Sequence, residues 1–221
     1  GGANALLDAY IRQNGKATSV VSLFMEDCIE KARGYYDMGA RYTIIAPHFG
    51  GFADSVNALC AIRQIVYEKR MCALDELVAI LRDNWQGHEE LRRYALERIS
   101  YYGNDEDEAD ILAVRLLKDF TEICESIPEE SGVRFAAGVS TFGRQIQWRG
   151  DRGAGAHGRL AEEILSGNVS PTPGTDRKGA TAIIRSMCKL PLRALPSATA
   201  LDIRLDPTVL RGEEGVDTIA A

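Results

Sequence analysis

The sequence predicts an α/β protein, and three observations lead to that class. Before Pro128, apolar residues recur at spacings of three and four, which is the period of amphipathic helices. One β-rich run over residues 42–45 interrupts these helices and should end at Pro47. Beyond Pro128, glycine and proline become frequent and the apolar runs favour strands and loops.

The first half of the chain carries the helical pattern. Gly50 and Gly51 separate the β-rich run from a helix, which Asp54 and Ser55 are expected to cap. The apolar face of that helix recurs at helical spacing, so we expect it to be buried. We expect helices over residues 5–13, 20–33, 56–66, 74–82 and 89–98.

An acidic run from Asp105 to Asp110 precedes an apolar stripe that extends to Phe120. We interpret it as the first turn of a long helix, where the helix dipole favours acids. A calcium-binding loop is the alternative, but its sixth position is Asp110 instead of glycine and its twelfth is Leu116 instead of glutamate. The helix start is therefore the prediction.

In the second half, residues 133–146 are interpreted as one or two strands. Glycine-rich and proline-rich loops are expected over residues 150–158 and 168–179. Two more strands are expected over residues 181–186 and 200–205, the second with clean alternation of apolar and polar positions. The last residues, from Gly212, are interpreted as the beginning of a helix, so the chain is expected to be a fragment.

Composition excludes several classes of protein. The 221 residues carry a net charge of −6 and no basic cluster, so nucleic-acid binding is not expected. No apolar run approaches the length of a membrane span, and no secretory signal opens the chain. The cysteines form no Cys-x-x-Cys pair, which favours reduced thiols in the cytoplasm. They are Cys28, Cys60, Cys72, Cys124 and Cys188.

Few residues point to chemistry by themselves. His48 follows a predicted strand and precedes two glycines, so it could line a pocket or be an ordinary loop histidine. His88 begins a pattern typical of zinc proteases, but position 92 is Arg92 and the second ligand is absent, so no metal site is predicted. The glycine-rich loop over residues 150–158 lacks the context of a phosphate cradle. The residues alone leave the function open.

Five segments together resemble the pyruvate formate-lyase family of glycyl radical enzymes. They occur in the family's order over about residues 20–216. Two departures concern His157, where the family usually has aspartate, and Asn57-Ala58, where it usually has Asp-Ser. The segments are DCIEKAR (27–33) with GARY (39–42), ALCAIRQIVYE (58–68), LDEL (74–77) with NWQG (84–87) and YGND (102–105), AGAHGR (154–159) with SPTPGTD (170–176), and LRGEEG (210–215).

The resemblance implies that residues 1–221 form one partial domain of a ten-stranded α/β barrel. In this family a cysteine thiyl radical abstracts hydrogen from a small substrate, and a glycyl radical is installed by an S-adenosylmethionine-dependent iron–sulfur activase. Both radical loops are expected outside this chain, because Cys28 matches an ordinary family cysteine. The stretch from Arg134 to Val139 only imitates the radical glycine motif. No catalytic residue, metal or bound cofactor is therefore assigned to this segment.

The resemblance also suggests where substrate lies and which partners are needed. The expected pocket residues come from two strand ends: His48, Phe49, Ser140, Thr141 and Phe142. The expected partners are the remainder of the barrel, the activating enzyme and a small-molecule substrate. Pairing with a second copy of the chain is left open. The segment would contribute to a formate C-acetyltransferase or a radical dehydratase or lyase and be inactive alone. The alternative is a stand-alone structural or interaction module derived from that barrel.

Overall fold

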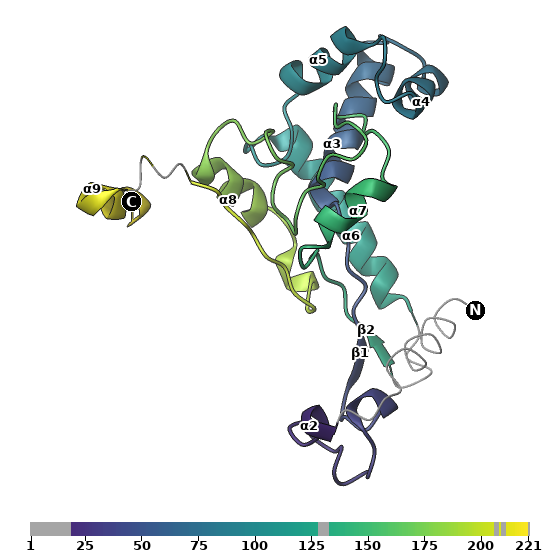
Figure 1. The fold of residues 1–221 in the computed structure, drawn as a ribbon, viewed down its shortest axis with the longest axis vertical. Helices are drawn as coiled ribbons and strands as arrows, with labels where there is room; N and C mark the ends of the chain where they lie inside the picture. The colour runs from purple at the N-terminus through teal and green to yellow at the C-terminus, as the bar shows by residue number, and fades with distance from the viewer. Residues whose placement is uncertain (1–18, 128–132, 206–207, 209–210, 221) are drawn as a thin grey trace.

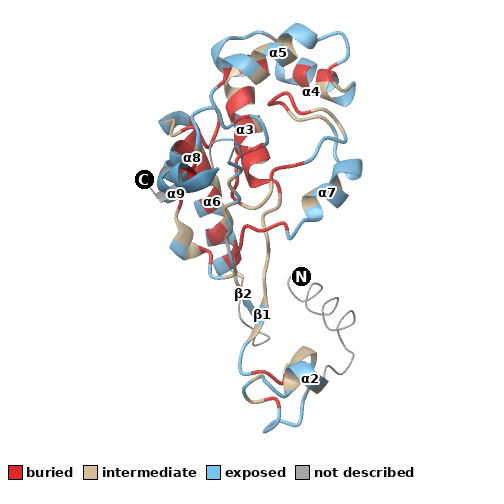
Figure 2. Cartoon of the chain, turned by 60° about the vertical axis from the view of Figure 1, so that its left-hand side comes forward, coloured by how far each residue is buried: buried red, intermediate tan, exposed pale blue. Residues whose placement is uncertain are grey.

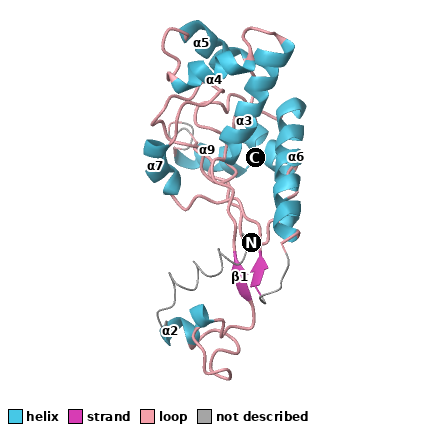
Figure 3. Ribbon diagram, turned by 90° about the vertical axis from the view of Figure 1, so that its right-hand side faces the viewer, coloured by secondary structure: helices cyan, strands magenta, loops and turns pink. Residues whose placement is uncertain are grey.

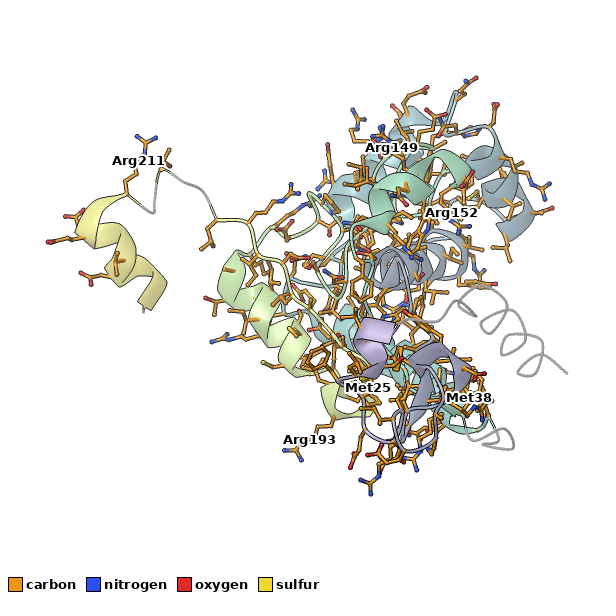
Figure 4. The ribbon with its side chains drawn as sticks, turned by 60° about the horizontal axis from the view of Figure 1, so that its bottom comes forward. Met25, Met38, Arg149, Arg152, Arg193 and Arg211 are labelled. Carbon is orange, nitrogen blue, oxygen red and sulfur yellow. The ribbon has the colours of Figure 1, made fainter. Side chains whose placement is uncertain are left out.

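The computed structural model describes residues 19–127, 133–205, 208 and 211–220. The molecule is elongated, with α2 (Ser19–Ser22) at one end and α4 and α5 at the other (Figure 1). Two short strands connect these ends. The last helix, α9 (Gly212–Ala220), lies apart from the other helices in Figures 1 and 4.

The strands pair in parallel. β1 (Thr43–Ile45) pairs with β2 (Val133–Phe135), with Thr43 opposite Val133. The pairing continues as single bridges, His48 to Gly138 and then Val139 to Thr199, so three extended segments lie in one parallel order. Parallel neighbours need a long crossover connection, which the helices between β1 and β2 supply. Figure 3 shows this pair as arrows below the helical part.

The core lies where α3 (Phe52–Ile62) packs on α6 (Asp107–Glu125). α3 continues as a π-helix, η2 (Arg63–Glu68). The buried face of α3 includes Phe52 and Val56, and that of α6 includes Leu117, all with no exposed surface. Figure 2 shows this inner layer in red. Burying such apolar side chains is the main favourable contribution to folding.

Three predicted helices are confirmed as α4 (Leu74–Arg82), α5 (Glu89–Arg98) and α6. The acids that precede and begin α6 bind a lysine: Lys189 Nζ lies 2.8 Å from Asp105, 3.0 Å from Asp107 and 2.7 Å from Asp110. The predicted helix start is thus confirmed. Loops over residues 152–158 and 168–179 are confirmed as well.

The predicted helix over residues 20–33 is wrong beyond Ser22. Turns follow α2, with positive φ at Asp27 (73°) and Ala32 (50°). Phe24, on the expected apolar face, is 83% exposed. Helices are stabilised mainly by packing of their apolar face, but here Cys28 is buried while Val21 and Ile29 are exposed together with Phe24. The helix predicted over residues 5–13 lies outside the described residues.

The strand predicted over residues 181–186 is wrong, because α8 (Ala180–Cys188) occupies it. Its β-branched residues suggested a strand, but Ala182, Ile183 and Ser186 are buried at helical spacing. Packing of that face overrides the local preference. The predicted strand end at Ile146 is also wrong, since Gly143 (φ 77°) begins α7 (Arg144–Trp148).

Residues 200–205 are extended but belong to no strand. Their backbone bonds to a loop: Val169 N–H donates to Ala200 O at 3.1 Å, and Asp202 N–H to Ser170 Oγ at 2.8 Å. The remaining short helices are η1 (Tyr35–Asp37), η3 (Arg149–Asp151) and η4 (Leu192–Ala194). In the described part of the chain, no helix combines the length and apolarity that crossing a membrane would require.

The turn after Tyr102 packs directly on the proline-rich loop. Gly103 has φ 99°, and a Cβ there would lie 2.4 Å from Pro171 Cγ. Gly103→Ala should therefore lower the free energy of unfolding by about 2 kcal/mol through strain and overlap. Gly174 has φ 82° but nothing within 4 Å of an added Cβ. Gly174→Ala should cost only the strain, about 1 kcal/mol. Urea denaturation checks the difference; equal losses would contradict the packing argument.

Candidate functional site

The extended segments present two different faces. The Phe49 ring lies 5.7 Å from Phe52 of α3 and 5.3 Å from Phe120 of α6, so Phe49 faces the helices. Because side chains alternate along extended backbone, His48 faces the other way. We call this opposite side the wall face. It carries Ile44, Ala46 and His48 from one segment and Arg134, Ala136 and Gly138 from its neighbour.

His48 is held on the wall face by a close approach to Gly138. A Cβ on Gly138 would lie 2.7 Å from His48 Cε1, so a larger residue would displace the ring. The ring of Phe142 stands edge-on to His48, with 5.4 Å between centroids. Burial lowers the pKa of His48, which favours the neutral imidazole. Its Nδ1 has no hydrogen-bond partner among the described residues.

Ser140 and Thr141 are both buried, unlike Phe142, which is 76% exposed. Thr141 N–H donates to Asn168 Oδ1 at 2.9 Å, and Asn168 Nδ2 donates to Asp202 Oδ2 at 2.7 Å. The five predicted pocket residues therefore separate by role. His48 and Phe142 meet on the wall face, Thr141 joins a loop, and Phe49 packs in the core. Asn168, with φ 52°, was missed as a link in this arrangement.

A cavity of about 440 Å³ lies beside His48, between the beginning of α3 and the segment that follows α7. The indole of Trp148 covers Gly50 so closely that a Cβ there would lie 2.4 Å from Trp148 Cζ3. This size is typical of small-molecule pockets. The lining residues are His48, Gly50, Gly51, Asp54, Ser55, Ala58, Trp148, Arg152, Gly155, His157, Arg159 and Leu165.

Asp54 was predicted to cap α3, and that prediction is wrong. The N-cap is Gly51, with no side-chain cap bond. The carboxylate instead accepts hydrogen bonds from Ser166 N–H at 2.7 Å and Thr172 Oγ1 at 2.8 Å. His157 Nε2 lies 3.3 Å from Asp54 Oδ1. The other predicted cap, Ser55, donates its hydroxyl to Gly51 O at 3.0 Å.

This network sets the charge state of Asp54. Burial alone would raise the pKa of Asp54, but His157, the Ser166 amide and the Thr172 hydroxyl stabilise the carboxylate. The pKa is consequently held below its ordinary value. His157 is only 2% exposed. At the sequence level His157 was interpreted as drift of the scaffold, whereas here it holds a buried carboxylate.

Three of the described cysteines are not activated nucleophiles. Burial raises the pKa of Cys60 to about 11 and also raises the pKa of Cys72 and Cys124. A thiol with a raised pKa is a poor nucleophile at neutral pH. Within the described ranges, no three metal-binding side chains come together.

Comparison with known proteins agrees with the fold and the order of its motifs. A family model described as pyruvate formate lyase-like matches residues 7–148. The probable dehydratase YbiW of Escherichia coli (strain K12) is 30% identical over 200 residues, which cover 87% of this chain and 25% of that protein. The (2S)-3-sulfopropanediol dehydratase of Klebsiella oxytoca is 30% identical over 92% of this chain and 25% of its own length.

Solved structures show the same similarity. A glycyl radical enzyme from Archaeoglobus fulgidus superposes with a TM-score of 0.86 and 34% identity, over 99% of this chain and 27% of that one. Hydroxyproline dehydratase from Clostridioides difficile gives a TM-score of 0.81 and 30% identity, over 90% of this chain and 25% of that one. The chain spans about a quarter of the length of these relatives. The α/β class and the partial barrel are thereby confirmed, and the chain belongs to the pyruvate formate lyase-like family.

Proposed function

We propose that this chain forms part of the barrel wall of a glycyl radical dehydratase or lyase and helps to line the pocket for a small polar substrate. The observation that carries the proposal is the position of His48 on the wall face, against Gly138 and Phe142. Since the helices cover the other face, the wall face is the side of the strands left for a barrel interior. Three of the four relatives named above are dehydratases, which favours that branch over formate C-acetyltransferases.

In the complete enzyme, hydrogen abstraction would depend on a thiyl and a glycyl radical outside this chain. An activase would install the glycyl radical in the cytoplasm. This segment would be inactive without the rest of the barrel, whether or not it pairs with a second copy. The contribution of this chain is to orient the substrate. His48 would hydrogen-bond a hydroxyl group as a neutral imidazole, and Phe142 would exclude water beside it. Thr141 and Ser140 would fix the strand end, and Phe49 would anchor it on the helices.

The test uses the complete enzyme that carries this segment. His48→Ala should lower kcat/KM for its hydroxylated substrate at least about tenfold, because it removes one oriented hydrogen bond. The glycyl radical content, measured by electron paramagnetic resonance, should stay unchanged. The control is His88→Ala, since His88 is an exposed residue just before α5. Unchanged kcat/KM in His48→Ala, or an equal loss in both variants, would contradict the assignment of His48.

A further inference from the structure

We propose that the cavity beside His48 binds a small oxyanion, such as a sulfate, phosphate or carboxylate group. The lining residues that carry the inference are Arg152, His157 and Arg159, together with the first turn of α3. This inference goes beyond the proposed pocket on the wall face. It concerns the described chain by itself and needs no radical chemistry.

The charges that line the cavity favour an anion, although the chain as a whole is acidic. Arg152 and Arg159 line the cavity, and Asp54 is the one acid that lines it. Asp54 is 6% exposed, and its carboxylate already accepts hydrogen bonds from Ser166 and Thr172. Arg152, which Figure 4 labels near α7, is exposed and makes no ion pair with the described residues. Two arginines thus face one carboxylate that is already hydrogen-bonded to Ser166 and Thr172.

Several buried nitrogen atoms in the lining lack hydrogen-bond partners among the described residues. His157 Nδ1 and Arg159 Nε have no hydrogen-bond partner among the described residues. Both residues are more than nine-tenths buried, His157 at 2% and Arg159 at 8% exposed. Leaving a buried donor unpaired is costly, so such groups point to a missing acceptor. His157 Nε2 lies 3.3 Å from Asp54 Oδ1, so Nδ1 is the ring nitrogen left to meet an anion.

The beginning of α3 adds a second source of positive potential. The first-turn amides of a helix lack intrahelical partners, and an anion is the group that satisfies them best. The N-cap Gly51 has no side chain to cap α3, and the Asp54 carboxylate is turned toward Ser166 and Thr172. Of the first-turn amides, that of Asp54 already donates to Ser166 Oγ at 3.3 Å. Gly50 and Gly51, which precede α3, line the same cavity and carry no side chain that would fill it. The helix end and the buried nitrogens therefore lie around one volume.

The terminal nitrogens of Arg159 make hydrogen bonds that fix the position of its side chain. Its Nη1 donates to Leu160 O and Glu163 O, each at 3.0 Å, and its Nη2 donates to Gly153 O. The terminal nitrogens are thus used to hold the loop. The Nε–H and the second N–H of Nη2 are left for a ligand, so Arg159 acts as a fixed donor. Arg152, which is exposed and lines the cavity, would supply a second positive charge to the bound anion.

The test is a titration of the 221-residue chain with sodium sulfate at pH 6 and constant ionic strength. Isothermal titration calorimetry measures the binding. We expect saturable binding to one site. Arg152→Gln and His157→Asn should each weaken it by about tenfold, which is the value of one charge-assisted hydrogen bond. The matched control is Arg115→Gln on α6, which removes the same charge from a side chain that is 79% exposed and outside the cavity. The affinity of Arg115→Gln for sulfate should differ from that of the original chain by less than about twofold.

Two results would overturn the inference: no saturable binding by the unchanged chain, or equal weakening by Arg152→Gln and Arg115→Gln. The second result would mean that the affinity for sulfate depends only on the net charge of the chain. His157→Asn removes a buried contact and can unfold the chain, so the decisive pair is Arg152→Gln against Arg115→Gln, both on the surface. Because no radical or substrate turnover is measured, failure here would leave the role proposed for His48 intact.

Discussion

Asp54→Ala is expected to lower the free energy of unfolding of this chain by about 4 kcal/mol. The change removes a buried acceptor and leaves the Ser166 amide and the Thr172 hydroxyl without their partner. It also leaves the buried His157 imidazole without the carboxylate 3.3 Å away. Each unsatisfied buried group carries its own desolvation cost, so the losses accumulate. Urea denaturation followed by circular dichroism measures the change.

The control is Asp119→Ala on α6, whose carboxylate is 57% exposed and 4.0 Å from Arg115. Surface changes of this kind alter stability by less than about 0.5 kcal/mol. A similarly small loss for Asp54→Ala would mean that the network does not hold α3 to the loop at Ser166. The comparison therefore separates a buried carboxylate from an ordinary surface one.

The same residue predicts a dependence on pH. The pKa of Asp54 is lower in the folded chain than its ordinary value, so the folded state favours the carboxylate. Its contribution to stability should be complete above the ordinary aspartate pKa of about 3.9 and disappear as pH falls through the lower folded value. The difference in unfolding free energy between the original chain and Asp54→Ala should therefore shrink between pH 5 and pH 2. A difference that stays constant over this pH range would contradict the lowered pKa of Asp54.

Sequence patterns predicted those elements whose signals are local. The helices α4, α5 and α6 followed from apolar spacing and from acids in the first turn. The strand β1 followed from a β-rich run ended by proline. The β-branched run in α8 led to a wrong strand prediction. Burial of one helical face determines the secondary structure there, and the local β preference does not.

The candidate site was predicted only in part for the same reason. His48 was found because it ends a strand, but its partners come from distant segments. Asp54 binds Ser166 and Thr172 at separations of 112 and 118 residues. A capping role was the local interpretation of Asp54, and only the tertiary structure shows that its carboxylate turns away from the helix. A single sequence gives no sign of such pairs.

Asn104→Ala should be nearly as damaging as Asp54→Ala, with a loss of about 4 kcal/mol in the free energy of unfolding. Asn104 is 3% exposed and uses its whole amide. Its Nδ2 donates to Tyr101 O at 2.9 Å and Thr175 O at 2.7 Å. Its Oδ1 accepts from Arg177 N–H at 2.7 Å and Lys178 N–H at 3.2 Å. Alanine would leave these four backbone groups without that partner at once.

Asn104→Asp sharpens this test, because aspartate has nearly the same shape. The carboxylate would keep the bonds from the Arg177 and Lys178 amides but would place an oxygen against the carbonyls of Tyr101 and Thr175. We therefore expect a loss of similar size from a substitution that leaves no cavity. The half-buried Asn84 is a poor control, since it accepts from Ala161 N–H at 2.7 Å, so Gln147→Ala on the surface of α7 serves instead. If Asn104→Asp were as stable as the original chain, the amide donors would not be what binds this turn to residues 175–178.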